Sequence, residues 1–140
     1  MSTPAGGDVL HRFVFEGAGI RGELVQLDAT WAAVQEIQDY PPTVAVQLGQ
    51  ALAAAALLSA TIKLDGSLIV QVQGAGPLHT LVVQASSRGT LRGLAQWRAE
   101  VPSGPDLETV FGAGRLVMTA EAPGGERYQG IVALEGADLA

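Results

Sequence analysis

The stretch SLIVQVQGAGPLHTLVVQA, residues 67–85, decides the fold that this sequence predicts. In residues 67–73, leucine and valine on one side alternate with isoleucine and glutamine on the other, which is the pattern of a strand with one buried face. The turn-forming residues 74–77 follow, and residues 78–85 form a second apolar run. Two such runs joined by a tight turn predict neighbouring strands of one sheet.

Further short strands are expected on both sides of this pair. The chain contains 18 glycines without a Gly-x-y period, which favours many tight turns and therefore short strands. Ahead of the pair, residues 9–16 and 20–27 are expected to form a hairpin around a turn at 17–19. The remaining strands are expected at 91–98, with Gly93 as a bulge, at 115–121 and at 128–135.

A first helix is expected directly after the hairpin. Asp28 is a suitable N-cap for a helix at 29–38, because its carboxylate can accept the free N–H groups of the first turn. Trp31, Val34 and Ile37 fall at helical spacing on one side of this helix and are expected to face the core.

A second, longer helix is expected to cover the sheet. The two prolines in residues 39–42 end the first helix, because a residue before proline is disfavoured in the α conformation. The helix that follows, at 43–61, carries an apolar stripe and a run of alanines that allows close packing on a sheet. A short third helix is expected to be capped by Asp106 and to end at 111.

The order of these elements predicts an α+β fold with a mixed, mostly antiparallel sheet packed against helices. A chain of 140 residues with 48% apolar residues suits one compact domain. Residues 1–7 are small and polar and are expected to fray, and residues 137–140 read as the start of a further helix.

Composition narrows the range of partners and compartments. The net charge of −6 makes nucleic acid a poor partner. The longest strongly apolar stretch, 51–60, is about half of the ~20 residues of a membrane span, so we expect no membrane. The first residues lack the pattern of a secretory signal, so we expect a cytoplasmic protein. The sequence has no cysteine, which excludes internal disulfides and thiolate zinc sites.

Residues 17–22 match the G-x-G-x-x-G pattern of dinucleotide-binding loops. That pattern must open a helix, whose N-terminus then holds the pyrophosphate. The residues that follow, 23–27, alternate like a strand instead. The interpretation is therefore a hairpin turn, and since no G-x-x-x-x-G-K-[ST] loop occurs either, no ATP site is expected.

Polar residues that could carry out catalysis are few and scattered. His11 and His79 lie inside expected strands without an acidic or histidine neighbour at ligand spacing, so they are interpreted as sheet residues rather than catalysts or metal ligands. No spacing among the acidic residues favours general acid–base chemistry, and we expect them to be solvated. The acidic residues considered are Glu16, Glu23, Asp39, Glu121, Glu126 and Glu135.

Apolar residues are plentiful, so the chain is expected to act by presenting surface rather than by catalysis. The sequence does not separate core residues from residues that would contact a partner, and for each the core interpretation is favoured. Tyr128, in a charged turn segment, is expected to anchor the core. The residues left open between core and contact are Val44, Leu48, Leu68, Val70, Val72, Leu81 and Val83.

Several segments, in this order and over nearly the whole chain, resemble the Hsp33 family. They are 10–13 (LHRF), 20–25 (IRGELV), 39–41 (DYP), 59–63 (SATIK), 65–66 (DG), 70–74 (VQVQG), 76–77 (GP), 125–132 (GERYQGIV) and 134–136 (LEG).

The resemblance implies an ATP-independent, redox-regulated holdase chaperone of the cytoplasm, which binds unfolding client proteins under oxidative stress and forms a homodimer. It implies no catalytic residue and no cofactor in this chain. The family's zinc and its redox switch belong to a C-terminal region with C-x-C and C-x-x-C pairs, and no position here matches them. Residues 1–140 would then be the N-terminal, client-binding and dimerisation core, incomplete at its C-terminal end, as a truncated piece or a proteolytic remnant.

Two other classes of function stay open at this point. One is a small-molecule-binding domain or enzyme that shares the fold, which would need a polar pocket near the histidines or carboxylates named above. The other is a structural dimerisation module, because unpaired strand edges invite a second copy of the chain.

Overall fold

The computed structural model describes residues 7–62, 65–98, 100–102, 106–136 and 139. The expectations of fraying at 1–7 and of a helix start at 137–140 lie outside this description, apart from residues 7 and 139.

A five-stranded antiparallel sheet forms the main body, in the order β5-β4-β3-β6-β7. The pair that the sequence marks most clearly, β3 and β4, lies at its centre and in register from Ser67 opposite Ser86 to Gln73 opposite Thr80. The α+β class is confirmed, and every strand pair is antiparallel. The strands of this sheet are β3 (Ser67–Gly74), β4 (Leu78–Ser86), β5 (Leu91–Trp97), β6 (Gly114–Glu121) and β7 (Arg127–Ala133).

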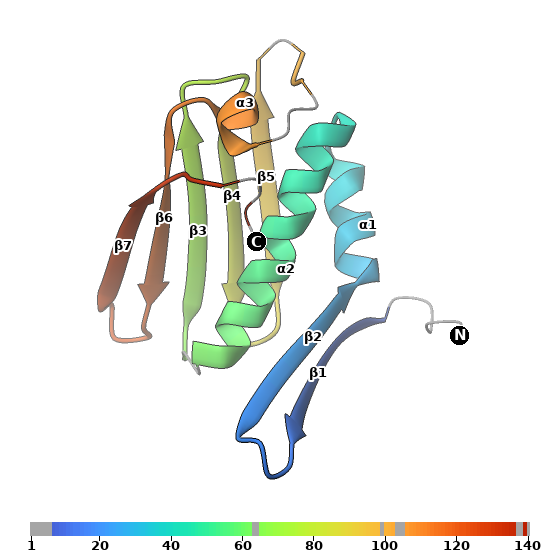
Figure 1. Ribbon diagram of the computed structural model, residues 1–140, viewed down its shortest axis with the longest axis vertical. Helices are drawn as coiled ribbons and strands as arrows, with labels where there is room; N and C mark the ends of the chain where they lie inside the picture. Colours follow the sequence, from blue (N-terminus) through green and yellow to red (C-terminus); the bar gives the residue numbers. More distant parts are fainter. Residues whose placement is uncertain (1–6, 63–64, 99, 103–105, 137–138, 140) are drawn as a thin grey trace.

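One face of the sheet carries the core. Leu68, Val70 and Val72 of β3 are buried on that face, and the long helix α2 (Pro42–Ile62) packs across β3, β4 and β5. Figure 1 shows α2 lying along these strands while β6 and β7 extend beyond it. The helix begins where the prolines predicted, and the carbonyl of Pro41 accepts its first hydrogen bond from the N–H of Ala45 at 2.8 Å.

Side chains of α2 pack closely against the sheet at Gly93. A Cβ atom at Gly93 would lie 3.1–3.2 Å from side-chain carbons of Leu48, Leu52 and Val83. The prediction of a bulge at Gly93 is wrong, because Gly93 pairs regularly with Val83, and the register shift lies at His79 in β4. A glycine inside a strand can mark close packing as well as a bulge, and here it marks packing.

Two short helices complete the body. The helix α1 (Asp28–Ile37) packs against β5 through its buried Val34, and α3 (Leu107–Phe111) buries Phe111. Asp106 caps α3 as predicted, since its carboxylate accepts the N–H of Thr109 at 2.9 Å. The Thr109 hydroxyl and N–H also lower the pKa of Asp106.

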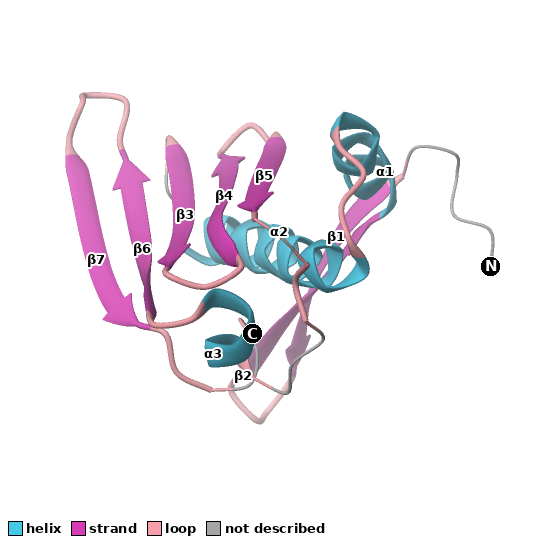
Figure 2. Ribbon diagram, turned by 90° about the horizontal axis from the view of Figure 1, so that it is seen from above, coloured by secondary structure: helices cyan, strands magenta, loops and turns pink. Residues whose placement is uncertain are grey.

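The N-terminal hairpin forms a separate two-stranded sheet. Its strands β1 (Asp8–Phe15) and β2 (Ile20–Leu27) pair along their whole length and extend away from the main body (Figure 1). Figure 2 shows the hairpin on the helix-bearing side of the five-stranded sheet. It meets the body mainly at α2, with a smaller contact to α1.

Two expectations about α1 are wrong. Asp28 does not cap the helix; instead Asp8 accepts the N–H groups of Ala29 and Thr30 at 2.9 and 3.2 Å, because the hairpin register places Asp8 opposite Leu27, just before the helix. Ile37 does not face the core, since it lies at the end of the helix and is 65% exposed.

Among the described helices, α2 is the one that is long and apolar enough to span a bilayer by length and composition, with a mean hydropathy of 1.5. The apolar run at 51–60 is thus only part of a 21-residue helix. Here Val44, Leu48 and Leu52 of that helix pack against the sheet, as in the core helix of a folded domain.

Candidate functional site

The two histidines are far apart in sequence and structure. His11 is exposed on the hairpin, and His79 is half-buried at the irregular start of β4, where its Nδ1 lies 2.9 Å from the Thr80 hydroxyl. Among the described residues, no group of three or more His, Cys, Asp or Glu side chains is arranged to hold a metal ion. The geometry therefore gives neither histidine an acidic partner or a metal-ligand set.

The acidic residues considered from the sequence have separate partners or are exposed. Glu121 pairs with Arg127 at 2.8 Å across the β6–β7 hairpin, and Glu126 accepts a hydrogen bond from the Tyr128 hydroxyl at 3.1 Å. Glu16, Asp39 and Glu135 are exposed. These side chains are placed at turns and strand ends, where water solvates them.

The glycine pattern at 17–22 is a hairpin turn, as interpreted. Gly17 and Gly19 have positive φ angles of 81° and 67°, which the turn requires, and β2 follows in place of a helix. The third glycine, Gly22, is needed for side-chain packing and not for the turn. The ring of Phe13 lies over it from the opposite strand and occupies the space that a Cβ would need.

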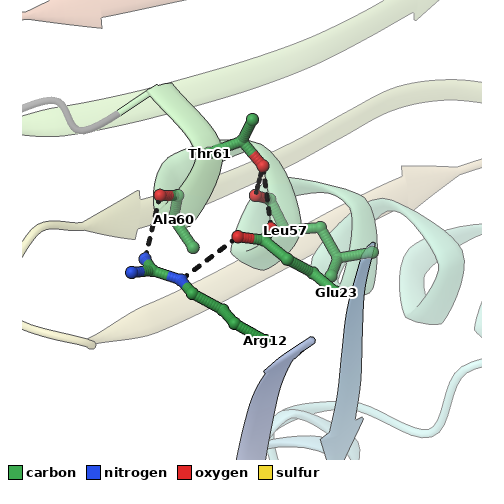
Figure 3. Close-up of polar contacts among 5 residues, drawn as sticks. All are labelled: Arg12, Glu23, Leu57, Ala60 and Thr61. Atoms are coloured by element: carbon green, nitrogen blue, oxygen red, sulfur yellow. Dashed lines mark hydrogen bonds and ion pairs between the residues drawn. The ribbon is translucent and has the colours of Figure 1, made fainter. Parts of the chain in front are cut away.

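A polar cluster fixes the hairpin to the end of α2 (Figure 3). The Arg12 guanidinium donates to the carbonyl of Ala60 at 3.0 Å and pairs with Glu23 at 3.2 Å. The Thr61 hydroxyl contacts Glu23 and the carbonyl of Leu57, both at 2.8 Å. Arg12 thus supplies a cation and a donor to the C-terminal carbonyls of α2, where the helix dipole favours positive charge.

Two cavities of about 530 Å³ border the hairpin. The first lies between Leu10 and Leu27 on one side and Ala56 and Leu91 on the other. The second is lined by the polar cluster and contains Glu23, the one carboxylate considered above that borders either cavity. A smaller cavity of about 380 Å³ next to His79 is lined by Gln38, Gln96 and Trp97. None of these cavities brings a histidine and a carboxylate from the sequence-based candidates together.

The apolar residues that the sequence left open between core and contact are all core. Each is at most 6% exposed in the layer between α2 and the sheet, so none of them presents surface. These residues are Val44, Leu48, Leu68, Val70, Val72, Leu81 and Val83.

Exposed apolar side chains gather instead on the hairpin. Its cross-strand pairs His11–Leu24, Phe13–Gly22 and Phe15–Ile20 lie on the face opposite Arg12 and Glu23. The rings of Phe13 and Phe15 meet edge to face at a centroid distance of 5.8 Å. Four of these side chains, Phe13, Phe15, Ile20 and Leu24, are 46–59% exposed. We call this surface, formed by His11, Phe13, Phe15, Ile20 and Leu24, the outer hairpin face.

A second exposed apolar region lies on β7. All seven of its residues are exposed, among them Ile131 and Val132. The expectation that Tyr128 anchors the core is wrong, because its side chain is 65% exposed. The reason is its place in the sheet: α2 covers β3 to β5 and does not reach the edge strand β7.

The sequence contained one signal for the outer hairpin face. Residues 9–16 carry apolar side chains at both odd and even positions, so a strand there exposes apolar surface on one side unless a second layer covers it. The exposure of Tyr128 had no comparable local signal, since the position of a strand within its sheet depends on pairing with distant segments.

The fold and these surfaces together define the class of the protein. The chain is an α+β domain with an antiparallel sheet covered by helices on one face. Its described residues expose large apolar side chains on the hairpin and on β7, and they include no group of three or more His, Cys, Asp or Glu side chains suited to a metal ion. Comparison with known proteins agrees with this class. The family model for the Hsp33 protein matches residues 8–140, and the chain belongs to the Hsp33 family.

Similar proteins carry the same family name. The chain is 62% identical to the 33 kDa chaperonin of Nitrosococcus oceani and 46% identical to that of Cronobacter sakazakii. Each alignment runs over 133 residues and covers 95% of this chain and 46% of the relative. The chain therefore spans about half the length of these relatives. The crystal structure of the 33 kDa chaperonin of Thermotoga maritima has the same fold, with a TM-score of 0.81 and 20% identity over 94% of this chain and 47% of that one.

Proposed function

We propose that this chain is the client-holding part of an ATP-independent chaperone, which binds unfolding proteins and prevents their aggregation, and that it is not an enzyme. The observation that carries the proposal is the outer hairpin face, where Phe13, Phe15, Ile20 and Leu24 stand exposed on one surface. Unfolding proteins expose apolar side chains, and an exposed apolar surface can bind them without a specific sequence.

The family name supports the chaperone part of this proposal. The relatives that the chain matches are named 33 kDa chaperonin, and the chain aligns with about half of each. The sequence contains no G-x-x-x-x-G-K-[ST] loop, which is consistent with an activity independent of ATP.

We further propose that redox control of this activity depends on zinc and thiolates outside these residues. The chain has no cysteine, and its described residues include no cluster of His, Asp and Glu side chains suited to a metal ion. The donor set of a thiolate zinc site does not fit this chain, so no step of the proposed activity passes through zinc here. The proposal also includes a cytoplasmic location, a homodimer, and neither nucleic acid nor membrane as partner.

The test is the light scattering of a thermally unfolding client protein with the chain added in several-fold excess. We expect suppressed scattering, and because no thiol is present, the same suppression with a thiol-specific oxidant or a reductant. Unchanged scattering at several-fold excess would reject a client-holding surface in this chain.

Surface variants locate the client contact. Phe15→Ser and Leu24→Ser remove apolar side chains from the outer hairpin face and should reduce the suppression several-fold. Val46→Ser and Ile37→Ser are matched controls, because these side chains are similarly exposed, at 55% and 65%, but lie on α2 and α1. Equal losses in all four variants would show that general surface hydrophobicity, and not the hairpin, carries the activity.

A further inference from the structure

The charged side chains of the hairpin strands all lie on one face. Asp8 and Arg12 of β1 share this face with Arg21 and Glu23 of β2, because even-numbered residues of β1 pair with odd-numbered residues of β2. Three of these charges are engaged toward the body: Arg12 pairs with Glu23 and donates to the carbonyl of Ala60, while Asp8 caps α1. Along strands 8–15 and 20–27, the outer hairpin face therefore carries no Asp, Glu, Lys or Arg side chain.

His11 is the one ionisable side chain on the outer hairpin face. It is exposed and lies opposite Leu24, and Phe13 is the next residue of β1 on the same face. The ring of Phe13 in turn meets Phe15 edge to face. The imidazole thus continues a row of aromatic side chains, and it can be either a neutral ring or a cation at that place.

The elements packed against the hairpin bring few charges to this face. The helix α2 contains no charged residue. On α1, the carboxylate of Asp28 accepts the side-chain amide of Gln26 at 2.9 Å, and Gln26 lies diagonal to His11. Within the described residues, no ion pair or hydrogen bond holds the His11 ring. The other charged side chains around the hairpin are Glu36 of α1, Glu16 of the turn, Asp65 across the first cavity, and the four on the inner face.

We propose that His11 controls which segments the outer hairpin face can hold: uncharged apolar segments are held while the imidazole is neutral and are released when it is protonated. The inference rests on the proposed function and deepens it, because it names a residue that determines client specificity and makes client holding depend on pH. Holding is then strong at neutral pH and weak in mild acid.

The physical reason is desolvation. An apolar segment that covers Phe13 and Leu24 also removes water from His11 between them and the end of the strand. Loss of water disfavours the charged form of an imidazole far more than the neutral form. A segment that binds the neutral form better must, by linkage, bind more weakly as pH falls through the range in which imidazole gains its proton.

The first test measures the affinity of a dye-labelled peptide of leucine, phenylalanine, serine and glycine with blocked ends, which has no ionisable side chain. Between about pH 7.5 and pH 5.5, histidine is the side chain that ordinarily changes charge, and this chain has two histidines and no cysteine. We expect the dissociation constant to rise about tenfold over this range, the change that corresponds to one pH unit of proton linkage.

Variants assign this change to one residue. His11→Gln is neutral at both pH values and should bind the peptide tightly at both. His11→Arg is a cation at both and should bind about tenfold more weakly at both. His79→Gln is the matched control, because His79 lies half-buried in β4 beside the Thr80 hydroxyl, and it should keep the pH dependence of the natural chain. Circular dichroism checks that each variant is folded.

The second test uses the scattering assay at constant neutral pH, where the client itself is unchanged. His11→Arg places a permanent charge on the outer hairpin face and should reduce the suppression of scattering several-fold. Val46→Arg adds the same charge on α2 at a position that is 55% exposed, and it should leave the suppression intact. Equal losses in both variants would assign the effect to the net charge of the chain and overturn the inference.

Three further results would overturn it: His11→Gln still losing affinity in acid, His79→Gln abolishing the pH dependence, or His11→Arg binding as tightly as the natural chain at neutral pH. Peptide binding of equal affinity at both pH values would also reject the inference but leave the proposed function standing. No peptide binding at either pH, together with unchanged scattering, would reject the proposed function itself and the inference with it.

Discussion

The carboxylate of Asp8 caps the first turn of α1 from the neighbouring strand, accepting the backbone N–H of Thr30 at 3.2 Å. It also accepts the Thr30 hydroxyl and the N–H of Ala29. Desolvation opposes ionisation of Asp8, but these three donors together outweigh it, so its pKa is lowered from 3.8. One side chain thus joins the hairpin to the helix that follows it.

Loss of this cap should destabilise the protein. We expect Asp8→Ala to lower the free energy of unfolding by about 1 kcal/mol, the usual effect of removing an N-cap. Asp8→Asn should lose less, because an amide oxygen still caps. Urea unfolding at neutral pH measures both. Equal effects of the two substitutions would show that the charge, rather than the acceptor, stabilises the helix.

The same carboxylate predicts a pH dependence. Because its pKa is lower in the folded chain than in the unfolded one, its contribution is present at neutral pH and is lost as pH falls through the folded value. The difference in unfolding free energy between the natural chain and Asp8→Asn should therefore shrink between about pH 5 and pH 2. A difference that stays constant over this range would contradict the role of the charge.

The ion pair of Arg12 with Glu23 should couple only weakly. Arg12 is largely exposed, so a double-mutant cycle with Arg12→Ala and Glu23→Ala should give about 0.2–1 kcal/mol. Added salt should reduce this coupling, because exposed charges are screened. Thermal unfolding of the four proteins at low and high salt is the measurement, and coupling that salt leaves unchanged would indicate a pair shielded from solvent.

Gly93 should tolerate no larger side chain. Gly93→Val places atoms against Leu48, Leu52 and Val83 and should cost about 1–3 kcal/mol by overpacking. Gly130→Val is the control, because a Cβ there meets nothing within 4 Å. Both are compared by urea unfolding. Equal costs at the two sites would mean that strand glycines matter for backbone conformation rather than for the approach of α2.

Truncation of the core should separate buried from exposed positions on α2. Leu48→Ala removes a side chain with no exposed surface and should cost about 2–5 kcal/mol. Val46→Ala, two residues away and 55% exposed, should change stability by less than about 0.5 kcal/mol. The two midpoints of urea unfolding give this comparison, and similar values would contradict the assigned packing face of α2.

The element positions were predictable because their signals are local. Alternation placed the strands to within two residues, and the prolines at 41 and 42 placed the start of α2 to within one. The cap of α1 was not predictable in this way, because Asp8 reaches Ala29 only after the hairpin has closed. The sequence favoured Asp28 as the cap because it is an aspartate directly before the helix, whereas the contact of Asp8 with Ala29 joins residues 21 positions apart.

The candidate surface was harder to predict than the fold. Leu68 and Tyr128 both lie in strands that the sequence predicts, yet Leu68 is buried under α2 and Tyr128 is exposed on the edge strand β7. Exposure depends on where a strand lies in the sheet, and that order, β5-β4-β3-β6-β7, follows from pairings between distant segments. The exposed apolar face of the hairpin could have been predicted, because residues 9–16 carry apolar side chains at both odd and even positions.

The separation of the hairpin from the main sheet has a consequence for motion. Strands β1 and β2 share no ladder with β3 to β7, and a few polar contacts fasten them to α1 and α2. Segments attached in this way open in excursions that leave the central sheet intact. The amide protons of the hairpin should therefore exchange with deuterium long before those of β3, because the hairpin can open while the central sheet stays folded.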